Sequence, residues 1–389
     1  MPAEQAVNVP DTFLLEGQPN ASDSPLENSI GLCLSGGGYR AMIFHVGVIW
    51  RLNELGYLPK LARISSVSGG SITAGLLGMK WSKLTFNAQG VATNLVEEFV
   101  QPLRAFAKET VDVWAVGIGA LNPLRSISEE VQGAYSKHLF GDATLQDLPD
   151  SPRFVINATN IQSGVLFRFS KPYQGDYRIG RILKPATPLA QAVAASSAFP
   201  PILSPCVLTV NPANFEADDS KIPADLKGKD FRSDIFLADG GVYDNLGLET
   251  VWKRCKTVLV SDAGQKIGDE TKPATDWPRH AVRVLDIEDN QVRSLRKRLL
   301  IAAYESKDRL GAYWGIRTDI ADYKLATALS CPHTKALTLA AIPTRLANLE
   351  DALQQRLINW GYAVCDAGMR AHVLPDEETQ PDFPYPGGI

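Results

Sequence analysis

Two abrupt strand-to-helix breaks near the start of the chain constrain its fold more than any other feature. In the first, the apolar run at residues 30–34 is followed by a serine, three glycines and a helical pattern that extends to about Leu55. In the second, a strand pattern at residues 64–67, with apolar, β-branched Ile64 and Val67, is followed by Ser68, two glycines and a helix of small residues. Two consecutive βα units place both breaks at one edge of one sheet, where open α/β proteins have their sites. We therefore predict an α/β fold.

Ser68 lies at the second break, in the position of a nucleophile. A serine between a strand and a helix is lifted out of the sheet, and it needs small neighbours because the backbone there is crowded. The helix that begins at Gly69 points its free N–H groups toward the hydroxyl, where they would stabilise an oxyanion. The usual pattern is G-x-S-x-G, whereas this chain has Ser66-x-Ser68-x-Gly70. Taken alone, the match is explained equally well by an ordinary strand-to-helix turn.

The glycine loop at the first break, residues 36–38, has three possible interpretations. A dinucleotide site requires G-x-G-x-x-G, and a phosphate loop requires G-x-x-x-x-G-K-[ST]; neither spacing is present. An oxyanion hole requires adjacent backbone N–H groups that face one point, and consecutive glycines permit this close approach. The spacing therefore favours an oxyanion hole.

Asp239 is the third candidate position. It follows an apolar strand pattern at residues 235–238 and precedes Gly240 and Gly241, so it is either a site residue or part of an ordinary Asx turn. None of the five histidines has a local context that suggests a triad, and His45, inside the first predicted helix, is interpreted as a core histidine. Asp239 is the better candidate for a base, because a carboxylate in a dry pocket can accept the proton of Ser68 directly.

Four short motifs together resemble the patatin-like phospholipase family. In chain order they are Ser35-Gly36-Gly37-Gly38-Tyr39-Arg40, Ser66-Val67-Ser68-Gly69-Gly70, Ala195-Ser196-Ser197-Ala198-Phe199-Pro200-Pro201 and Asp239-Gly240-Gly241, the last extended by Asp244-Asn245-Leu246-Gly247. They cover about residues 30–264. The resemblance implies a three-layer α/β/α fold with a central, mostly parallel sheet. It also implies a Ser-Asp dyad without histidine, which needs no metal or other cofactor.

The resemblance assigns roles to individual residues. Ser68 would be the nucleophile and Asp239 the base. The oxyanion hole would be formed by Gly36, Gly37, Gly38 and Gly69, and the site would be supported by Arg40, Gly240 and Gly241. Two positions depart from the family pattern: Ser66 replaces the first glycine of the elbow, and Ala41 stands where the glycine-loop motif often ends in glycine.

The implied function is a serine acyl hydrolase that cleaves carboxylic esters of lipids, of the phospholipase A or lysophospholipase type. Three alternatives remain open. The same dyad could serve a thioesterase or peptidase. The hydrolase could be a regulated lipid-degrading toxin or defence effector. The chain could also be a non-catalytic lipid-binding protein.

Composition narrows the partners and the compartment. The chain of 389 residues has a net charge of -4, which argues against a general nucleic-acid binder. Its five cysteines are scattered, odd in number and without CxxC spacing, as in a reduced, cytoplasmic protein. No apolar run approaches the roughly 18 residues of a membrane-spanning helix. We expect a phospholipid or lysophospholipid substrate reached by peripheral membrane contact. The oligomeric state is not predicted.

The expected organisation is a flexible N-terminal arm at residues 1–28 and a single catalytic domain at residues 29–389. The core motifs occupy about residues 30–264, and a helical C-terminal part occupies about residues 279–372. Residues 282–285 are interpreted as a short strand. Residues 343–371 contain a long helix that would dock on the core through Leu346, Leu349, Leu353 and Leu357.

Two segments could contact lipid, although a simpler interpretation is favoured for both. The apolar residues 113–121 are interpreted as a core segment, with a lipid-contacting cap as the alternative. The basic residues within 291–309 are interpreted as a solvated helix face, with contact to an anionic surface as the alternative.

Overall fold

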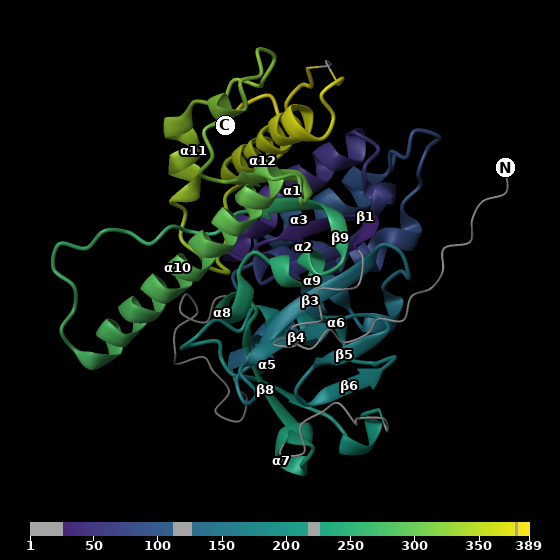
Figure 1. Ribbon diagram of the computed structural model, residues 1–389, viewed down its shortest axis with the longest axis vertical. Coiled ribbons are helices and arrows are strands. Elements are labelled where there is room, and N and C mark those ends of the chain that lie inside the picture. The colour runs from purple at the N-terminus through teal and green to yellow at the C-terminus, as the bar shows by residue number, and fades with distance from the viewer. Residues whose placement is uncertain (1–25, 112–126, 217–225, 378–379) are drawn as a thin grey trace.

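The computed structural model of the chain describes residues 26–111, 127–216, 226–377 and 380–389. Within these residues, a ten-stranded sheet forms the centre of the molecule (Figure 1). Its strands are β1 (Glu27–Leu34), β2 (Leu61–Val67), β3 (Arg153–Asn160), β4 (Val165–Phe169), β5 (Tyr173–Asp176), β6 (Gly180–Leu183), β7 (Cys206–Thr209), β8 (Asp234–Asp239), β9 (Cys255–Asp262) and β10 (Leu310–Gly315).

The sheet is parallel where the two predicted breaks lie. The strand order is β10-β9-β1-β2-β3-β4-β5-β6, and the first five strands of this order run in the same direction. Strands β4 to β6 continue the sheet in antiparallel fashion, and β7 and β8 form a further antiparallel pair attached to β3. The predicted α/β fold with a central, largely parallel sheet is confirmed.

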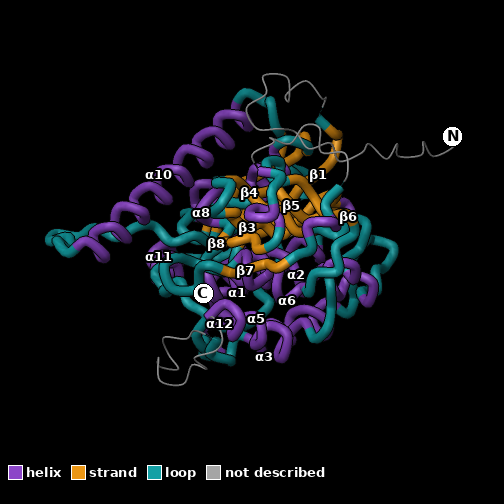
Figure 2. Tube along the Cα trace, turned by 90° about the horizontal axis from the view of Figure 1, so that it is seen from below, coloured by secondary structure: helices purple, strands orange, loops and turns teal. Residues whose placement is uncertain are grey.

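Helices cover both faces of this sheet. They are α1 (Gly38–Glu54), α2 (Gly69–Lys80), α3 (Gln101–Phe106), α5 (Ile127–Tyr135), α6 (Leu189–Ser196), α7 (Lys229–Arg232), α8 (Gly241–Asp244), α9 (Leu248–Trp252), α10 (Trp277–Glu305), α11 (His333–Ala340) and α12 (Asp351–His372). In Figure 2, α1, α2, α3, α5, α6 and α12 gather on one side of the strands, and α10 runs along the other side.

The layers are held by two hydrophobic cores on opposite faces of the sheet. Because side chains alternate along a strand, Leu32 and Leu34 of β1 point into the larger core, and Cys33 points into the smaller one. The smaller core also receives Val258 of β9 and Leu300 of α10. This arrangement is the predicted three-layer α/β/α architecture.

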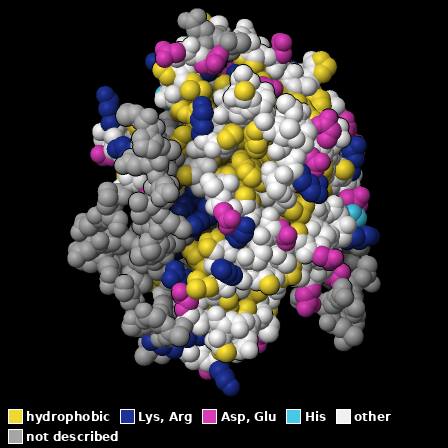
Figure 3. Space-filling view, turned by 90° about the vertical axis from the view of Figure 1, so that its right-hand side faces the viewer, with side chains coloured by type: hydrophobic (Ala, Val, Ile, Leu, Met, Phe, Trp, Pro, Cys, Tyr) yellow, Lys and Arg dark blue, Asp and Glu magenta, His cyan; other side chains and the backbone are white. Residues whose placement is uncertain are grey.

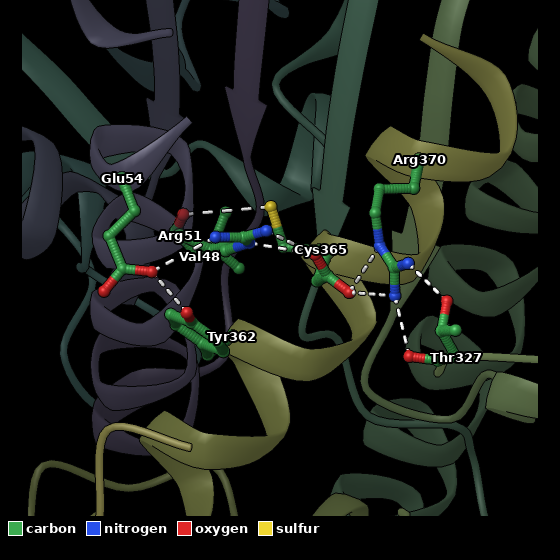
Figure 4. Close-up of polar contacts among 8 residues, drawn as sticks. Val48, Arg51, Glu54, Thr327, Tyr362, Cys365 and Arg370 are labelled. Carbon is green, nitrogen blue, oxygen red and sulfur yellow. Dashed lines mark hydrogen bonds and ion pairs between the residues drawn. The ribbon is translucent and has the colours of Figure 1, made fainter. Parts of the chain in front are cut away.

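The helix that carries the glycine loop, α1, packs against the C-terminal helix α12. Glycines allow the two backbones to approach closely: a Cβ on Gly47 would lie 1.9 Å from the carbonyl oxygen of Ile358, and one on Gly361 would lie 2.0 Å from that of Phe44. Beside this crossing, the buried carboxylate of Asp366 binds Arg51 of α1 and Arg370 of α12 (Figure 4). The C-terminal helix is therefore an integral support of α1.

Several predicted elements differ from the structure. Residues 282–285 belong to α10 and not to a strand, because a short apolar run has no decisive period of its own. The part expected to be helical also supplies β10, an edge strand paired with β9. Leu346 and Leu349 are buried as expected, but they precede α12, which begins at Asp351.

Two other predictions fall wholly or partly outside the described residues. The predicted arm at residues 1–28 overlaps the structure only at its end, where β1 begins at Glu27. The apolar residues 113–121 lie outside the described residues. Among the helices that the structure describes, none is both long and apolar enough to cross a membrane.

Candidate active site

Ser68 and Asp239 meet because β2 and β8 lie end to end along one edge of β3. Val67 at the end of β2 pairs with Asn157, and Asp239 at the end of β8 pairs with the next residue, Ala158. The other edge of β3 is occupied by β4. Since β2 runs parallel to β3 and β8 runs antiparallel to it, the carboxyl ends of β2 and β8 point at each other. Two residues far apart in the sequence thus arrive at one point.

Ser68 has the strained backbone of a sharp strand-to-helix turn. Its φ of 51° and ψ of -121° are unusual for a residue with a side chain. The surrounding structure holds this conformation, because the amide of Ser68 donates a hydrogen bond of 2.9 Å to Ser196 Oγ. The next residues, Gly69 and Gly70, have no room for a side chain: a Cβ there would lie 2.1 Å from Gly38 O and 2.4 Å from Leu34 O, respectively.

Ser196 connects the elbow to the sheet, a role that the sequence reasoning missed. Its hydroxyl donates to the carbonyl of Asn157 at 2.6 Å and lies 2.9 Å from Ser71 Oγ, while it accepts the Ser68 amide. Its carbonyl accepts the amide of Gly240 at 3.3 Å. The available signal was the third motif, residues 195–201, which contains this serine.

The carboxylate of Asp239 is almost fully buried, with 2% of the residue exposed. Burial raises the pKa of Asp239 to about 7, with a smaller contribution in the same direction from the nearby charge of Asp289. A hydrogen bond of 2.7 Å from the amide of Gly241 and one from the side chain of Ser68 oppose this increase in pKa. The carboxyl group is therefore in contact with the Ser68 hydroxyl and changes its charge near neutral pH.

The glycine loop lies directly against the elbow. Gly37 and Gly38 have φ values of 142° and 60°, in the region that favours glycine. A Cβ on Gly36 would lie 3.1 Å from Ser68 Cβ. The amide of Gly36 already donates to the carbonyl of Asn245 at 3.1 Å, whereas those of Gly37, Gly38 and Gly69 have no acceptor among the described residues. Gly36 is thus the member of the predicted oxyanion set whose amide is not available.

The loop rests on two segments from the C-terminal half of the chain. The guanidinium of Arg40 donates to the carbonyl of Ala263 at 3.0 and 3.2 Å and to that of Ile342. The amide of Tyr39 donates to the carbonyl of Arg345 at 2.9 Å. Nothing in the local sequence indicated the contacts with Ile342 and Arg345, because they come from a segment about 300 residues away.

The side-chain amide of Asn245 lies next to the glycine loop and Asp239. Its Oδ1 lies 2.4 Å from the position that a Cβ on Gly36 would take. The position of a Cβ on Gly241 is 2.8 Å from Asn245 Oδ1 and 3.0 Å from Asp239 Oδ1. The small residues Gly36 and Gly241 therefore make room for this amide between the glycine loop and the carboxylate. Asn245 belongs to the fourth motif, but the sequence alone indicated no role for it.

His45 is a core histidine, as interpreted from the sequence. Its Nδ1 lies 2.9 Å from Ser261 Oγ and its Nε2 lies 3.0 Å from the carbonyl oxygen of Ser35, so both ring nitrogens are engaged. Burial lowers the pKa of His45 to about 4. Gly240 is also constrained, because a Cβ there would lie 2.4 Å from the carbonyl oxygen of Asn157. Among the described residues, no group of three or more His, Cys, Asp or Glu is arranged to hold a metal ion.

Known proteins resemble this chain in sequence family and in fold. The family model for patatin-like phospholipases matches residues 32–252. No curated protein matches the chain in sequence. In structure, the chain resembles human GIVD cytosolic phospholipase A2, with 12% identity and a TM-score of 0.50 over 90% of this chain and 62% of that one. The same enzyme in complex with methyl gamma-linolenyl fluorophosphonate gives 14% identity and a TM-score of 0.50, over 88% and 59% of the two chains.

A weaker likeness is to VipD from Legionella pneumophila, with 15% identity and a TM-score of 0.35 over 90% of this chain and 68% of that one. The chain spans about 62% of the length of the human phospholipase, and at such low identity the likeness shows the fold. The family model, in contrast, matches more than half of the chain and includes all three clustered sequence elements of the site. The chain therefore belongs to the patatin-like phospholipase family, a family of lipid hydrolases.

Proposed function

We propose that the chain is a serine acyl hydrolase that cleaves the carboxylic esters of phospholipids or lysophospholipids. One observation carries the proposal: the side chain of Ser68, on a strained turn, is hydrogen-bonded to a buried carboxylate whose pKa is about 7. A nucleophile and a base in direct contact are what acyl transfer requires. Membership of the family supports a lipid substrate.

In the first half of the reaction, Ser68 Oγ attacks the ester carbonyl carbon while Asp239 accepts the hydroxyl proton. The amides of Gly37, Gly38 and Gly69 donate to the carbonyl oxygen as it becomes negative. Collapse of the tetrahedral intermediate breaks the bond to the alcohol of the glycerol backbone, which takes the proton from Asp239. Ser68 is left as an acyl ester of the fatty acid.

In the second half, Asp239 removes a proton from a water molecule, and the hydroxide attacks the acyl carbon. The same three amides stabilise the second intermediate. The fatty acid leaves when the bond to Ser68 Oγ breaks, and the proton held by Asp239 returns to the serine. Arg40 keeps the glycine loop in place, and Gly240 and Gly241 position the carboxylate, to which the Gly241 amide donates a hydrogen bond.

We assign Asn245 to the substrate. Its side-chain amide is only partly buried and has no hydrogen-bond partner among the described side chains. Its oxygen Oδ1 lies against both the glycine loop and the carboxylate, where it can accept a hydrogen bond from a hydroxyl of the substrate, while Nδ2 faces Gly264.

The substrate implies contact with a membrane surface, and we propose that the protein makes this contact peripherally. We place its action in the cytoplasm, since its five cysteines are free and buried and so suit a reducing compartment. Neither nucleic acid nor a cofactor enters the proposed reaction.

The test is hydrolysis of phosphatidylcholine and lysophosphatidylcholine by the wild type, Ser68→Ala, Asp239→Asn and the double variant. We expect each single variant to lose ester hydrolysis, and the double variant to lose no more, because the two residues act as one unit. Ser163→Ala serves as the control, since Ser163 is also buried but lies in the β3–β4 turn against Asp176. Near-normal turnover by Asp239→Asn would refute the dyad.

Two further measurements separate the alternatives. A fluorophosphonate probe should label wild-type Ser68 and leave Ser68→Ala unlabelled; no labelling of the wild type would favour a non-catalytic lipid-binding protein. Matched acyl thioester and peptide substrates should be turned over more slowly than the lipid ester. A preference for either one would transfer the same dyad to a thioesterase or a peptidase.

A further inference from the structure

Helix α10 carries most of the large hydrophobic side chains that are exposed in the described part of the chain. Eight of fourteen such residues lie on this one helix of 29 residues. They are Trp277, Val282, Val284, Leu285, Ile287, Val292, Leu295 and Leu299, with exposed fractions from 38% for Val282 to 81% for Trp277. We call these eight residues the apolar surface of α10. So strong a concentration marks an interaction surface rather than scattered exposure.

The helix is attached to the body mainly by its C-terminal half. Leu300 and Ala303 are its buried residues, and the hydroxyl of Tyr304 donates to the carbonyl of Val258 at 2.7 Å. Arg296 forms ion pairs with Asp244 and Glu249. The N-terminal half has no buried residue and projects from the body, as Figures 1 and 2 show. Its apolar side chains are therefore open to a large partner.

The distribution around the helix favours a lipid surface over a second helix. At about 100° per residue, Val292, Leu295 and Leu299 form one stripe, but Val282, Leu285 and Ile287 spread the apolar surface over more than half of the circumference. A helical partner contacts only a narrow stripe of a helix, whereas a helix that lies in the headgroup region contacts lipid over a broad face. The most exposed member is Trp277, and tryptophan is enriched at membrane interfaces.

Helix α10 also passes near the element that follows Asp239. Helix α10 passes α8, which begins two residues after Asp239, and the charge of Asp289 acts on the Asp239 carboxylate. Val242 of α8 and Phe199, just after α6, are each 52% exposed and lie in the motifs that carry the site. A surface bound through α10 would therefore lie near the elements that carry Ser68 and Asp239.

The charge of α10 also differs from that of the whole chain. Over its whole length the helix has six Lys and Arg residues against four Asp and Glu residues, whereas the chain has 39 against 43. This basic excess lies in the C-terminal half of the helix, so the contact made by the N-terminal half rests on its apolar side chains. The basic residues are Arg279, Arg283, Arg293, Arg296, Lys297 and Arg298. On the face shown in Figure 3, in contrast, charged side chains of both signs lie among the hydrophobic ones.

We propose that α10 docks the protein on a phospholipid bilayer, with the apolar surface of its N-terminal half lying in the headgroup region. This inference rests on the proposed function, because docking would bring the lipid substrate close to Ser68.

The first test measures binding to phosphatidylcholine vesicles and to equimolar phosphatidylcholine–phosphatidylglycerol vesicles. All proteins carry Ser68→Ala, so that no lipid is consumed. We expect Trp277→Ser/Leu285→Ser/Ile287→Ser to bind at least about tenfold more weakly, since it removes much of the apolar area that enters the bilayer. The matched control is Ile161→Ser/Leu183→Ser/Val207→Ser, three residues that are 40–51% exposed outside α10. Equal binding by the two triple variants would overturn the proposal.

The second test locates the helix directly. Brominated phosphatidylcholine should quench a component of the tryptophan fluorescence that disappears in Trp277→Phe. Sedimentation velocity tests the alternative that a second copy of the chain covers this surface. A wild-type dimer that the α10 variant converts to a monomer, with vesicle binding unchanged, would show this alternative to be right and the proposal wrong.

The outcomes also separate this proposal from the proposed function. If the wild type hydrolyses neither a short soluble ester nor lipid, the proposed function fails, while vesicle binding still tests α10. If the wild type hydrolyses both and the α10 variant loses only vesicle activity, both proposals hold.

Discussion

At the scale of single residues, the state of Asp239 controls the proposed chemistry. The carboxyl group must be ionised to accept the proton of Ser68, and burial raises its pKa to about 7. We therefore expect kcat/KM for a short soluble ester to fall about tenfold per pH unit below about pH 7 and to level off above it. A profile that is flat between about pH 5 and pH 8 would contradict Asp239 as the base.

The same raised pKa affects stability, with the opposite sense to the usual paired aspartate. Between about pH 4 and pH 7 the folded state holds a proton on Asp239 that the unfolded chain has lost, so this group makes the fold less stable as pH rises. Relative to the wild type, Asp239→Asn should gain up to roughly 3–4 kcal/mol of unfolding free energy across this range, and no more above it. Urea unfolding at several pH values measures the difference.

Asn245 offers a test that separates a catalytic role from a structural one. Asn245→Ala should lower kcat/KM by roughly tenfold, the scale of one lost hydrogen bond to the substrate. Asn245→Asp places a second carboxylate beside Asp239, so it should also move the midpoint of the pH–rate profile upward. A purely structural residue would lower the melting temperature in both variants and leave that midpoint unchanged.

The sequence identified residues whose function follows from their immediate neighbours. Ser68 and Asp239 each follow a strand directly and precede two glycines, so a local pattern was sufficient to select them. Ser196 and Asn245 stand in quoted motifs, but their roles arise from contacts with residues more than 100 positions away. The amide of Gly36 was assigned to the oxyanion hole for the same reason, since only the fold reveals that Asn245 accepts it.

At the scale of elements, the direction of a strand was harder to predict than its presence. Residues 235–238 were correctly interpreted as a strand, but their antiparallel pairing with β3 depends on a partner about 80 residues earlier. The apolar residues of α10 illustrate a different difficulty. A helix that stands away from the body has no buried face, so the usual helical period of hydrophobic residues is blurred and a strand at 282–285 looked plausible.

The packing of α12 against α1 depends on a buried charged side chain. The Asp366 carboxylate is fully buried and binds Arg51 at 2.8 Å and Arg370 at 2.7 Å (Figure 4). Asp366→Ala leaves two guanidinium groups without this partner and should lower the free energy of unfolding by about 3–5 kcal/mol.

Asp351 of the same helix provides the matched comparison. It pairs with Arg104 at 2.7 Å and Lys108 at 3.4 Å, but its side chain is 51% exposed. Asp351→Ala should therefore cost only about 0–1 kcal/mol. Urea unfolding of both variants gives the two values, and similar losses would mean that the buried network is not what holds α12 on α1.

At the scale of the whole molecule, the C-terminal part completes a site whose motifs all lie before it. Arg40 and Tyr39 donate to the carbonyls of Ile342 and Arg345, and α12 buries its length against α1. β10 covers the edge of β9, which in turn pairs with β1. The sequence placed the boundary of the motif region at about residue 264, but the contacts that stabilise the glycine loop cross it. A pattern of local motifs contains no information about such distant supports.

A chain that ends at Gly264 keeps every motif and should nevertheless fail to fold. It loses the partner of α1, exposes the edge of β9, and leaves Arg40 with one carbonyl acceptor instead of two. We expect it to aggregate and to leave Ser68 unlabelled by a fluorophosphonate. A chain that ends at Val373 keeps α12 and loses only the segment whose Tyr385 and Gly388 carbonyls bind Asn359, so it should fold and label with a lowered melting temperature. A monomeric, labelled chain ending at Gly264 would instead show that the C-terminal part is a separate unit, contrary to the single domain expected for residues 29–389.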